Sequence, residues 1–137
     1  MIFLNKNFYL TANKLSNKIG YGFNEEKRLQ SIAHVLEMPI HVNEECYRKF
    51  SGLAESAATG TFCAGNANNQ AVCYGDSGSG LYVLHQGTYY LRGIVSATMV
   101  EYEDDSLRLV CKTEIYALFT DMIYFRDWIE NFPNTRN

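Results

Sequence analysis

Short apolar segments separated by turn residues run along most of this 137-residue chain. Two of them, residues 81–85 and 88–95, flank Gln86-Gly87, and two such segments joined by a glycine-containing turn predict a β-hairpin. Segments of similar character lie at 29–41 (ending near Pro39), 107–110 and 115–119. Short apolar runs bounded by turn residues are typical of strands, so the pattern predicts an all-β domain.

The C-terminal segment has a different period. Thr120 or Asp121 can cap a helix, and Pro133 can end it. Between them, four apolar residues fall close to one helical face: Met122, Phe125, Ile129 and Phe132. We expect a single helix packed on the strands by this face, with Trp128 in core or edge packing rather than in a binding platform.

Composition narrows the classes of partner. The net charge is −3, charged residues make up 20% of the chain, and no basic run occurs, so nucleic acid and anionic membrane are not expected partners. No run of 18 apolar residues is present to cross a membrane. The apolar stretch at the amino terminus, residues 1–4, is too short for a signal-peptide core.

Four cysteines, Cys46, Cys63, Cys73 and Cys111, allow three disulfide pairings. No Cys-x-x-Cys occurs and the histidines are not spaced as co-ligands, so we expect no metal and no other cofactor. Disulfides favour an oxidising, secreted setting.

The loop Gly75-Asp76-Ser77-Gly78-Ser79-Gly80 carries the candidate chemistry. Glycines at 75 and 78 can adopt positive φ, and a tight turn there can aim the amides of Gly75 and Ser77 at one point, as in an oxyanion hole. The spacing fits neither a dinucleotide fingerprint nor a P-loop, and Ser79 breaks the Gly-x-Ser-x-Gly elbow. By itself such a hexapeptide is more often a plain loop.

The flanking motifs change that interpretation. In order and spacing they resemble the second β-barrel of chymotrypsin-like (trypsin-family) serine proteases: residues 20–22, 43–47, 62–65, 73–78, 91–96, 116–120 and 126–129. The resemblance runs from about residue 19 to 132 and divides the chain into a residual N-terminal segment, 1–18, and a barrel, 19–137. It implies a single six-stranded antiparallel Greek-key barrel with a C-terminal α-helix. Residues 90–96 and the separated Cys111 also resemble insect modular and clip-type proteases.

The resemblance assigns roles to the loop. Ser77 is implied as the nucleophile, and Gly75 and Ser77 as the oxyanion-hole N–H donors. The carboxylate of Asp76 is implied to be buried and to pair with an N-terminal ammonium that proteolytic activation creates. The implied disulfides are Cys46–Cys63 and Cys73–Cys111.

Substrate-binding positions are implied at Tyr74, Ala71, Ser96, Ala97, Thr98 and Glu114. Ala71 stands where trypsin carries an aspartate, so a preference for Lys or Arg side chains is not supported. Thr98 is bulkier than the family's usual glycine and favours small side chains, whereas Glu114 would restore an acidic pocket floor. Ser79-Gly80 replaces the family's Gly-Pro. An acidic loop over residues 99–110 is either a solvated loop or an exosite for basic partners.

Catalysis of this type needs a histidine that takes the serine proton and an aspartate that orients it. The resemblance places both in a first barrel, upstream of Gly20, and residues 1–18 contain neither residue type. His34, His41 and His85 fall within the second-barrel pattern, and we expect surface or edge positions for them, remote from Ser77.

Three hypotheses follow. The chain is the C-terminal half of a secreted serine endopeptidase, inactive in isolation, whose partners are a polypeptide substrate and the missing first barrel. Alternatively, it is an inactive homologue that acts as a binding or regulatory module through a protein partner. The third hypothesis is a non-functional gene fragment.

Overall fold

The computed structural model describes residues 16–22, 31–41, 59–66, 72–103, 108–112 and 116–132, together with Glu44 and Arg48. Its strands are β1 (Ser16–Gly20), β2 (His34–Glu37), β3 (Ile40–His41), β4 (Thr61–Ala64), β5 (Gly80–His85), β6 (Thr88–Ala97), β7 (Val100–Glu103), β8 (Arg108–Cys111) and β9 (Ala117–Asp121). A 3₁₀ turn, η1 (Met122–Phe125), and a short helix, α2 (Arg126–Asn131), follow. None of the described helices is long and apolar enough to span a membrane.

Seven of these strands form one antiparallel sheet in the order β2-β1-β5-β6-β9-β4-β3. The two edge strands, β2 and β3, are separated along the chain only by Met38 and Pro39. They are two halves of one bent strand: the Met38 amide donates to the Ser16 carbonyl (2.8 Å) on one side, and the Gly65 amide donates to the Pro39 carbonyl (3.0 Å) on the other. Counting β2 and β3 once, the sheet closes into a barrel of six strands, which confirms the predicted fold class.

An apolar core fills most of the barrel interior. Phe62 of β4 and Phe119 of β9 are 2% and 0% exposed, and their rings stack with centroids 5.5 Å apart. Gly93 of β6 faces this pair, since a Cβ there would lie 2.6 Å from Cζ of Phe62. Other core residues come from β3, β4, β5, β6, β9 and two connecting segments: Met38, Ile40, Ala64, Val72, Leu81, Val83, Val95 and Ala117. Burial of each large apolar side chain stabilises the fold by about 1.5–3 kcal/mol.

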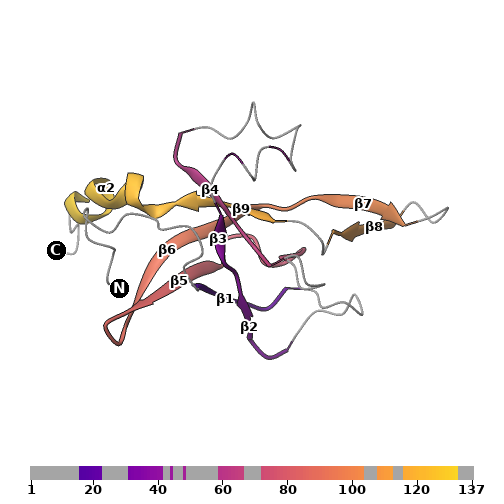
Figure 1. The fold of residues 1–137 in the computed structure, drawn as a ribbon, viewed down its shortest axis with the longest axis horizontal. Coiled ribbons are helices and arrows are strands. Elements are labelled where there is room, and N and C mark those ends of the chain that lie inside the picture. The colour runs from indigo at the N-terminus through magenta and orange to yellow at the C-terminus, as the bar shows by residue number, and fades with distance from the viewer. Residues whose placement is uncertain are drawn as a thin grey trace.

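The predicted hairpin is confirmed. β5 and β6 pair from His85↔Thr88 to Gly80↔Ile94, and Gln86 and Gly87 form the turn with φ of 48° and 76°. Positive φ at both central residues is the geometry whose twist matches that of the flanking strands. The other predicted strands correspond to β2 with β3, β8 and β9, and the β7–β8 hairpin extends to the side opposite α2 (Figure 1).

The C-terminal helix differs from the sequence prediction. Asp121 caps it as expected, since its side chain accepts a hydrogen bond from the Ile123 amide (2.9 Å). The first turn, however, is 3₁₀, and a turn of 3.0 residues shifts the phase of the apolar face. Met122 is buried, but Phe125 is 43% and Phe132 59% exposed. Trp128 is 64% exposed and its ring meets the Phe132 ring at an angle, so it packs at the edge of the domain rather than in the core.

Candidate active site

The candidate nucleophile lies on a loop that leads into β5. Gly75 and Gly78 have φ of 88° and 82°, as the sequence predicted. Two short turns fix the loop internally: the Asp76 amide donates to the Cys73 carbonyl (3.0 Å), and the Ser79 amide donates to the Asp76 carbonyl (2.9 Å). We refer to residues 73–79 as the Ser77 loop.

Two further hydrogen bonds attach the Ser77 loop to β6. The Gly78 amide donates to the Val95 carbonyl (3.1 Å), and the Val95 amide donates to the Ser79 carbonyl (2.9 Å). Ser77 itself is exposed. Within the described part of the chain, the amides of Gly75 and Ser77 donate no hydrogen bond, so both remain available to an incoming acceptor.

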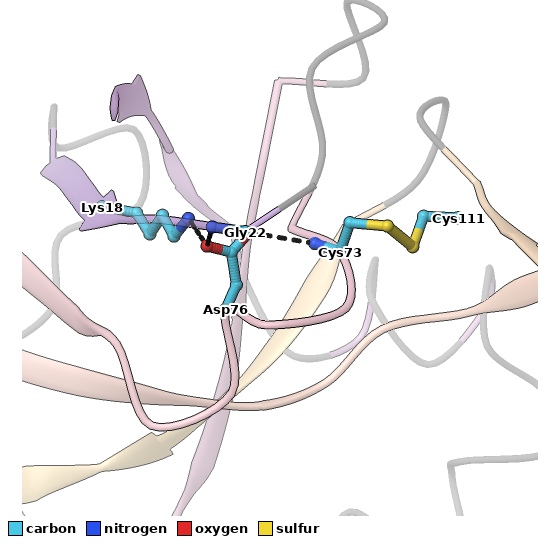
Figure 2. Close-up of a disulfide and its surroundings, with 5 residues drawn as sticks. All are labelled: Lys18, Gly22, Cys73, Asp76 and Cys111. Carbon is cyan, nitrogen blue, oxygen red and sulfur yellow. Dashed lines mark hydrogen bonds and ion pairs between the residues drawn. A yellow bond between two sulfur atoms is a disulfide. The ribbon is translucent and has the colours of Figure 1, made fainter. Parts of the chain in front are cut away.

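Asp76 points away from solvent, into the barrel. Its side chain is 3% exposed, and its Oδ1 atom forms an ion pair with Nζ of Lys18, whose side chain is 2% exposed. The Gly22 amide donates to the same oxygen (2.9 Å), and the Cys73 amide donates to Oδ2 (3.1 Å). Figure 2 shows Lys18 and Gly22 meeting one oxygen of the carboxylate while Cys73 approaches the other. The partner of Asp76 in this structure is therefore a lysine of the same barrel.

Sequence reasoning missed Lys18, which it placed in the residual N-terminal segment. β1 begins at Ser16, and its burial alternates so that Ser16, Lys18 and Gly20 are buried while Ile19 is exposed. The sequence carried no signal for this burial, since charged side chains are rarely buried unless they are paired and the partner of Lys18 lies 58 residues away.

Two glycines leave space for this ion pair. A Cβ at Gly20 would lie 2.6 Å from both Oδ1 of Asp76 and Nζ of Lys18. A Cβ at Gly22 would overlap the Asp76 carboxylate itself. The Gly20-Tyr21-Gly22 motif is thus required by the close approach of the Ser77 loop to β1.

A disulfide joins Cys73 to Cys111 across 38 residues, with the two Cα atoms 5.5 Å apart, which confirms this predicted pairing. It ties the first residue of the Ser77 loop to the end of β8 (Figure 2). Cys63 is also disulfide-bonded. Cys46 lies outside the described residues, so the Cys46–Cys63 pairing stays a prediction.

The predicted substrate-binding residues are described only in part. The end of β6 lies beside the Ser77 loop through Val95, and a register shift between Val95 and Ala97 leaves Ser96 exposed. Such bulges often adjoin active sites. Ala97 and Thr98 are half-buried there, and Tyr74 is 45% exposed on the loop. Ala71 and Glu114 lie outside the described residues.

The histidines are placed elsewhere in the barrel. His34 is exposed at the start of β2, and His85 ends β5 with its ring at an angle to Tyr90. His41 is half-buried in β3, with Nε2 2.5 Å from the Gly65 carbonyl and its ring stacked on Tyr116 at 3.8 Å. Among the described residues, no group of three His, Cys, Asp or Glu side chains is arranged to hold a metal.

Fold and site together define a class of protein. The sequence matches the trypsin family over residues 5–129, so the chain belongs to that family. It is 32% identical over 114 residues to serine protease gd of Drosophila melanogaster, covering 74% of this chain and 21% of the relative.

Two more relatives have similar levels of identity. Phenoloxidase-activating factor 1 of Holotrichia diomphalia is 27% identical over 82% of this chain and 28% of its own length. Protein masquerade of Drosophila melanogaster is 33% identical over 62% of this chain and 8% of its own length. The chain therefore spans between a twelfth and about a quarter of the length of these curated relatives.

Proposed function

We propose that this chain is the C-terminal half of a serine endopeptidase domain in which Ser77 is the nucleophile. The supporting observation is the Ser77 loop: an exposed hydroxyl and two unengaged amides are held between a buried carboxylate and the end of β6. Membership of the trypsin family supports a nucleophilic role for this hydroxyl and an oxyanion-binding role for these amides.

In the proposed reaction, Oγ of Ser77 attacks the carbonyl carbon of the scissile peptide bond and gives its proton to a histidine of the first barrel. The carbonyl oxygen becomes an oxyanion, to which the amides of Gly75 and Ser77 donate. Collapse of this intermediate breaks the C–N bond, the histidine protonates the leaving amine, and water then releases the acyl group from Ser77. Loss of one oxyanion-hole donor typically costs about 3–4 kcal/mol of transition-state stabilisation.

The proposed substrate is a polypeptide whose reacting segment lies along the end of β6. Ala97 and Thr98 are half-buried beside the Ser77 loop, and a threonine there narrows the entrance toward small side chains. Ala71 supports the same preference because it supplies no charge for a basic side chain. Glu114 on the pocket floor would reverse this preference, so it is the residue to substitute in a specificity assay.

We also propose an extracellular location and a first-barrel partner. The Cys73–Cys111 disulfide persists in oxidising surroundings, which supports secretion. The relatives extend well beyond the matched region, which leaves room in them for a barrel that carries the histidine and aspartate.

The test is peptide hydrolysis by a complete protein that contains both barrels, comparing the parent with Ser77→Ala and with the surface control Glu130→Gln. We expect Ser77→Ala to lower turnover by about 10⁶-fold and the control to leave it unchanged. The isolated 137-residue chain should not cleave peptides. A folded complete protein without hydrolysis would contradict the endopeptidase and favour the inactive binding or regulatory module.

A further inference from the structure

Lys18 is fixed in position by the barrel itself. Its backbone pairs on both sides, with Leu36 of β2 and with Leu81 of β5. A strand held between two neighbours cannot shift its register without breaking both ladders and turning its buried side chains outward. The pairing of β1 on both sides therefore fixes where the Lys18 side chain enters the barrel.

At that point the ammonium meets the only carboxylate with which it pairs among the described residues. Both side chains of the Lys18–Asp76 pair are at least 97% buried, and the carboxylate accepts hydrogen bonds from Gly22 and Cys73 as well. Removing one member of such a pair leaves a buried, uncompensated charge, which is strongly unfavourable. Asp76 therefore depends on Lys18 for its buried position.

On the side that faces Gly20 and Gly22, the pair leaves no space for a further atom. A single added carbon at Gly20 would contact Lys18 and Asp76 at 2.6 Å, and one at Gly22 would overlap the carboxylate.

The backbone of Asp76 fixes the position of the neighbouring nucleophile, Ser77. It precedes Ser77 directly, its amide donates to Cys73, and its carbonyl accepts from Ser79. The two turns of the Ser77 loop thus share Asp76 as their common residue.

We infer that Lys18 is an internal counter-ion that positions the Ser77 loop. The resemblance to the trypsin family implies that Asp76 pairs with an amino terminus created by proteolysis. In this barrel, Lys18 supplies that positive charge instead. The ordered loop then does not require cleavage of the chain. The consequence for Ser77 reactivity rests on the proposed function, whereas the coupling between Lys18 and the loop does not.

The test is amide hydrogen exchange of the 137-residue chain and of three variants, each with a cation replaced by methionine. Lys18→Met removes the counter-ion. Arg92→Met breaks a second buried ion pair, Arg92–Asp121, and Arg126→Met breaks an exposed pair with Glu130. We expect Lys18→Met to accelerate exchange at Asp76 and Ser79 by at least about tenfold relative to β9 amides.

Arg92→Met should accelerate amide exchange across the whole barrel, with no larger effect on the Ser77 loop than on β9. Arg126→Met should change the exchange rate of neither the loop nor β9. If the Asp76 and Ser79 amides exchange no faster in Lys18→Met than in Arg126→Met, the inference is overturned. Loop coupling together with a Ser77 that stays unreactive in the complete protein, both uncut and after proteolytic activation, would refute the proposed function and leave the role of Lys18 in positioning the loop intact.

A second measurement needs no variant and covers the case in which Lys18→Met does not fold. Acetic anhydride is applied to the unaltered chain, and modification of Lys18 is followed by mass spectrometry. Because Lys18 is 2% exposed and ion-paired, it should react at least about 100-fold more slowly than a free lysine amide until the chain unfolds. Modification at the free rate in the folded chain would overturn the inference.

Discussion

The backbone amide of Gly22, two residues beyond the end of β1, lies 2.9 Å from Oδ1 of Asp76, so the chain after β1 contacts this carboxylate directly through its backbone. This contact explains why a glycine is needed here, although the φ of Gly22 lies outside the left-handed region.

Gly22→Ala tests that contact. The added methyl group overlaps the Asp76 carboxylate, and we expect it to lower the free energy of unfolding by about 1–3 kcal/mol, as measured by urea denaturation. Gly87→Ala is the matched control, because a Cβ there meets nothing within 4 Å and the cost comes only from its φ of 76°. Faster exchange at Ser79 should appear in Gly22→Ala alone; an alanine at 22 without effect on the loop would contradict this explanation.

A second buried ion pair joins β6 to the start of the C-terminal helix. Arg92 is 2% exposed, and its guanidinium binds both oxygens of Asp121, with Nη2 2.6 Å from Oδ2. Its Cζ atom also lies 4.9 Å from the centroid of the Phe62 ring. Arg92→Met should lower the free energy of unfolding by about 3–5 kcal/mol because Asp121 would remain buried without a cation.

A double-mutant cycle with Asp121→Asn checks that the loss arises from this pair. Asparagine keeps an oxygen for the Ile123 amide, so the cap is retained while the charge is removed. The two substitutions should be strongly non-additive. Additive losses in denaturation experiments would show that Arg92 acts mainly by filling space.

The Cys73–Cys111 disulfide should stabilise the chain by about 4 kcal/mol, from the entropy of closing a 38-residue loop in the unfolded state. The variant that carries both Cys73→Ala and Cys111→Ala measures this contribution without reducing the disulfide of Cys63. Its urea midpoint should fall. An unchanged midpoint would mean that the bond contributes nothing to the folded barrel.

The hairpin turn offers a stabilising substitution. Gln86 has φ of 48°, which a side-chain-bearing residue adopts at a cost, and asparagine tolerates this region better than glutamine does. Gln86→Asn should raise stability by about 0.5 kcal/mol, seen as a higher thermal midpoint. A lower midpoint would mean that the Gln86 side chain makes a stabilising contribution of its own.

The sequence predicted the parts of the structure that depend on local chemistry. A two-residue turn that contains glycine was predicted at Gln86-Gly87, and both residues have positive φ there. Asp121 was predicted as a possible helix cap, and its side chain accepts a hydrogen bond from the Ile123 amide. The prediction of the Ser77 loop as the candidate site and of the Cys73–Cys111 bond came from the resemblance to the trypsin family, since the cysteines alone allowed three pairings.

The misses involve tertiary packing. Lys18 was assigned to the residual N-terminal segment, and only the pairing of β1 with β2 and β5 reveals that it points inward. The apolar face of the C-terminal helix was predicted from an α-helical period. The 3₁₀ turn at Met122 breaks that period, and Phe125 and Phe132 are exposed. In both cases packing against neighbouring elements, not the residue's own propensity, decides burial.

The most direct measurement is covalent labelling of a complete, two-barrel protein by a fluorophosphonate, with the modified residue identified by mass spectrometry. The account predicts a single adduct on Ser77 at near one-to-one stoichiometry, and none on the isolated 137-residue chain. An unlabelled Ser77 in a folded complete protein, or an adduct on another serine, would contradict the assignment of Ser77 as the nucleophile.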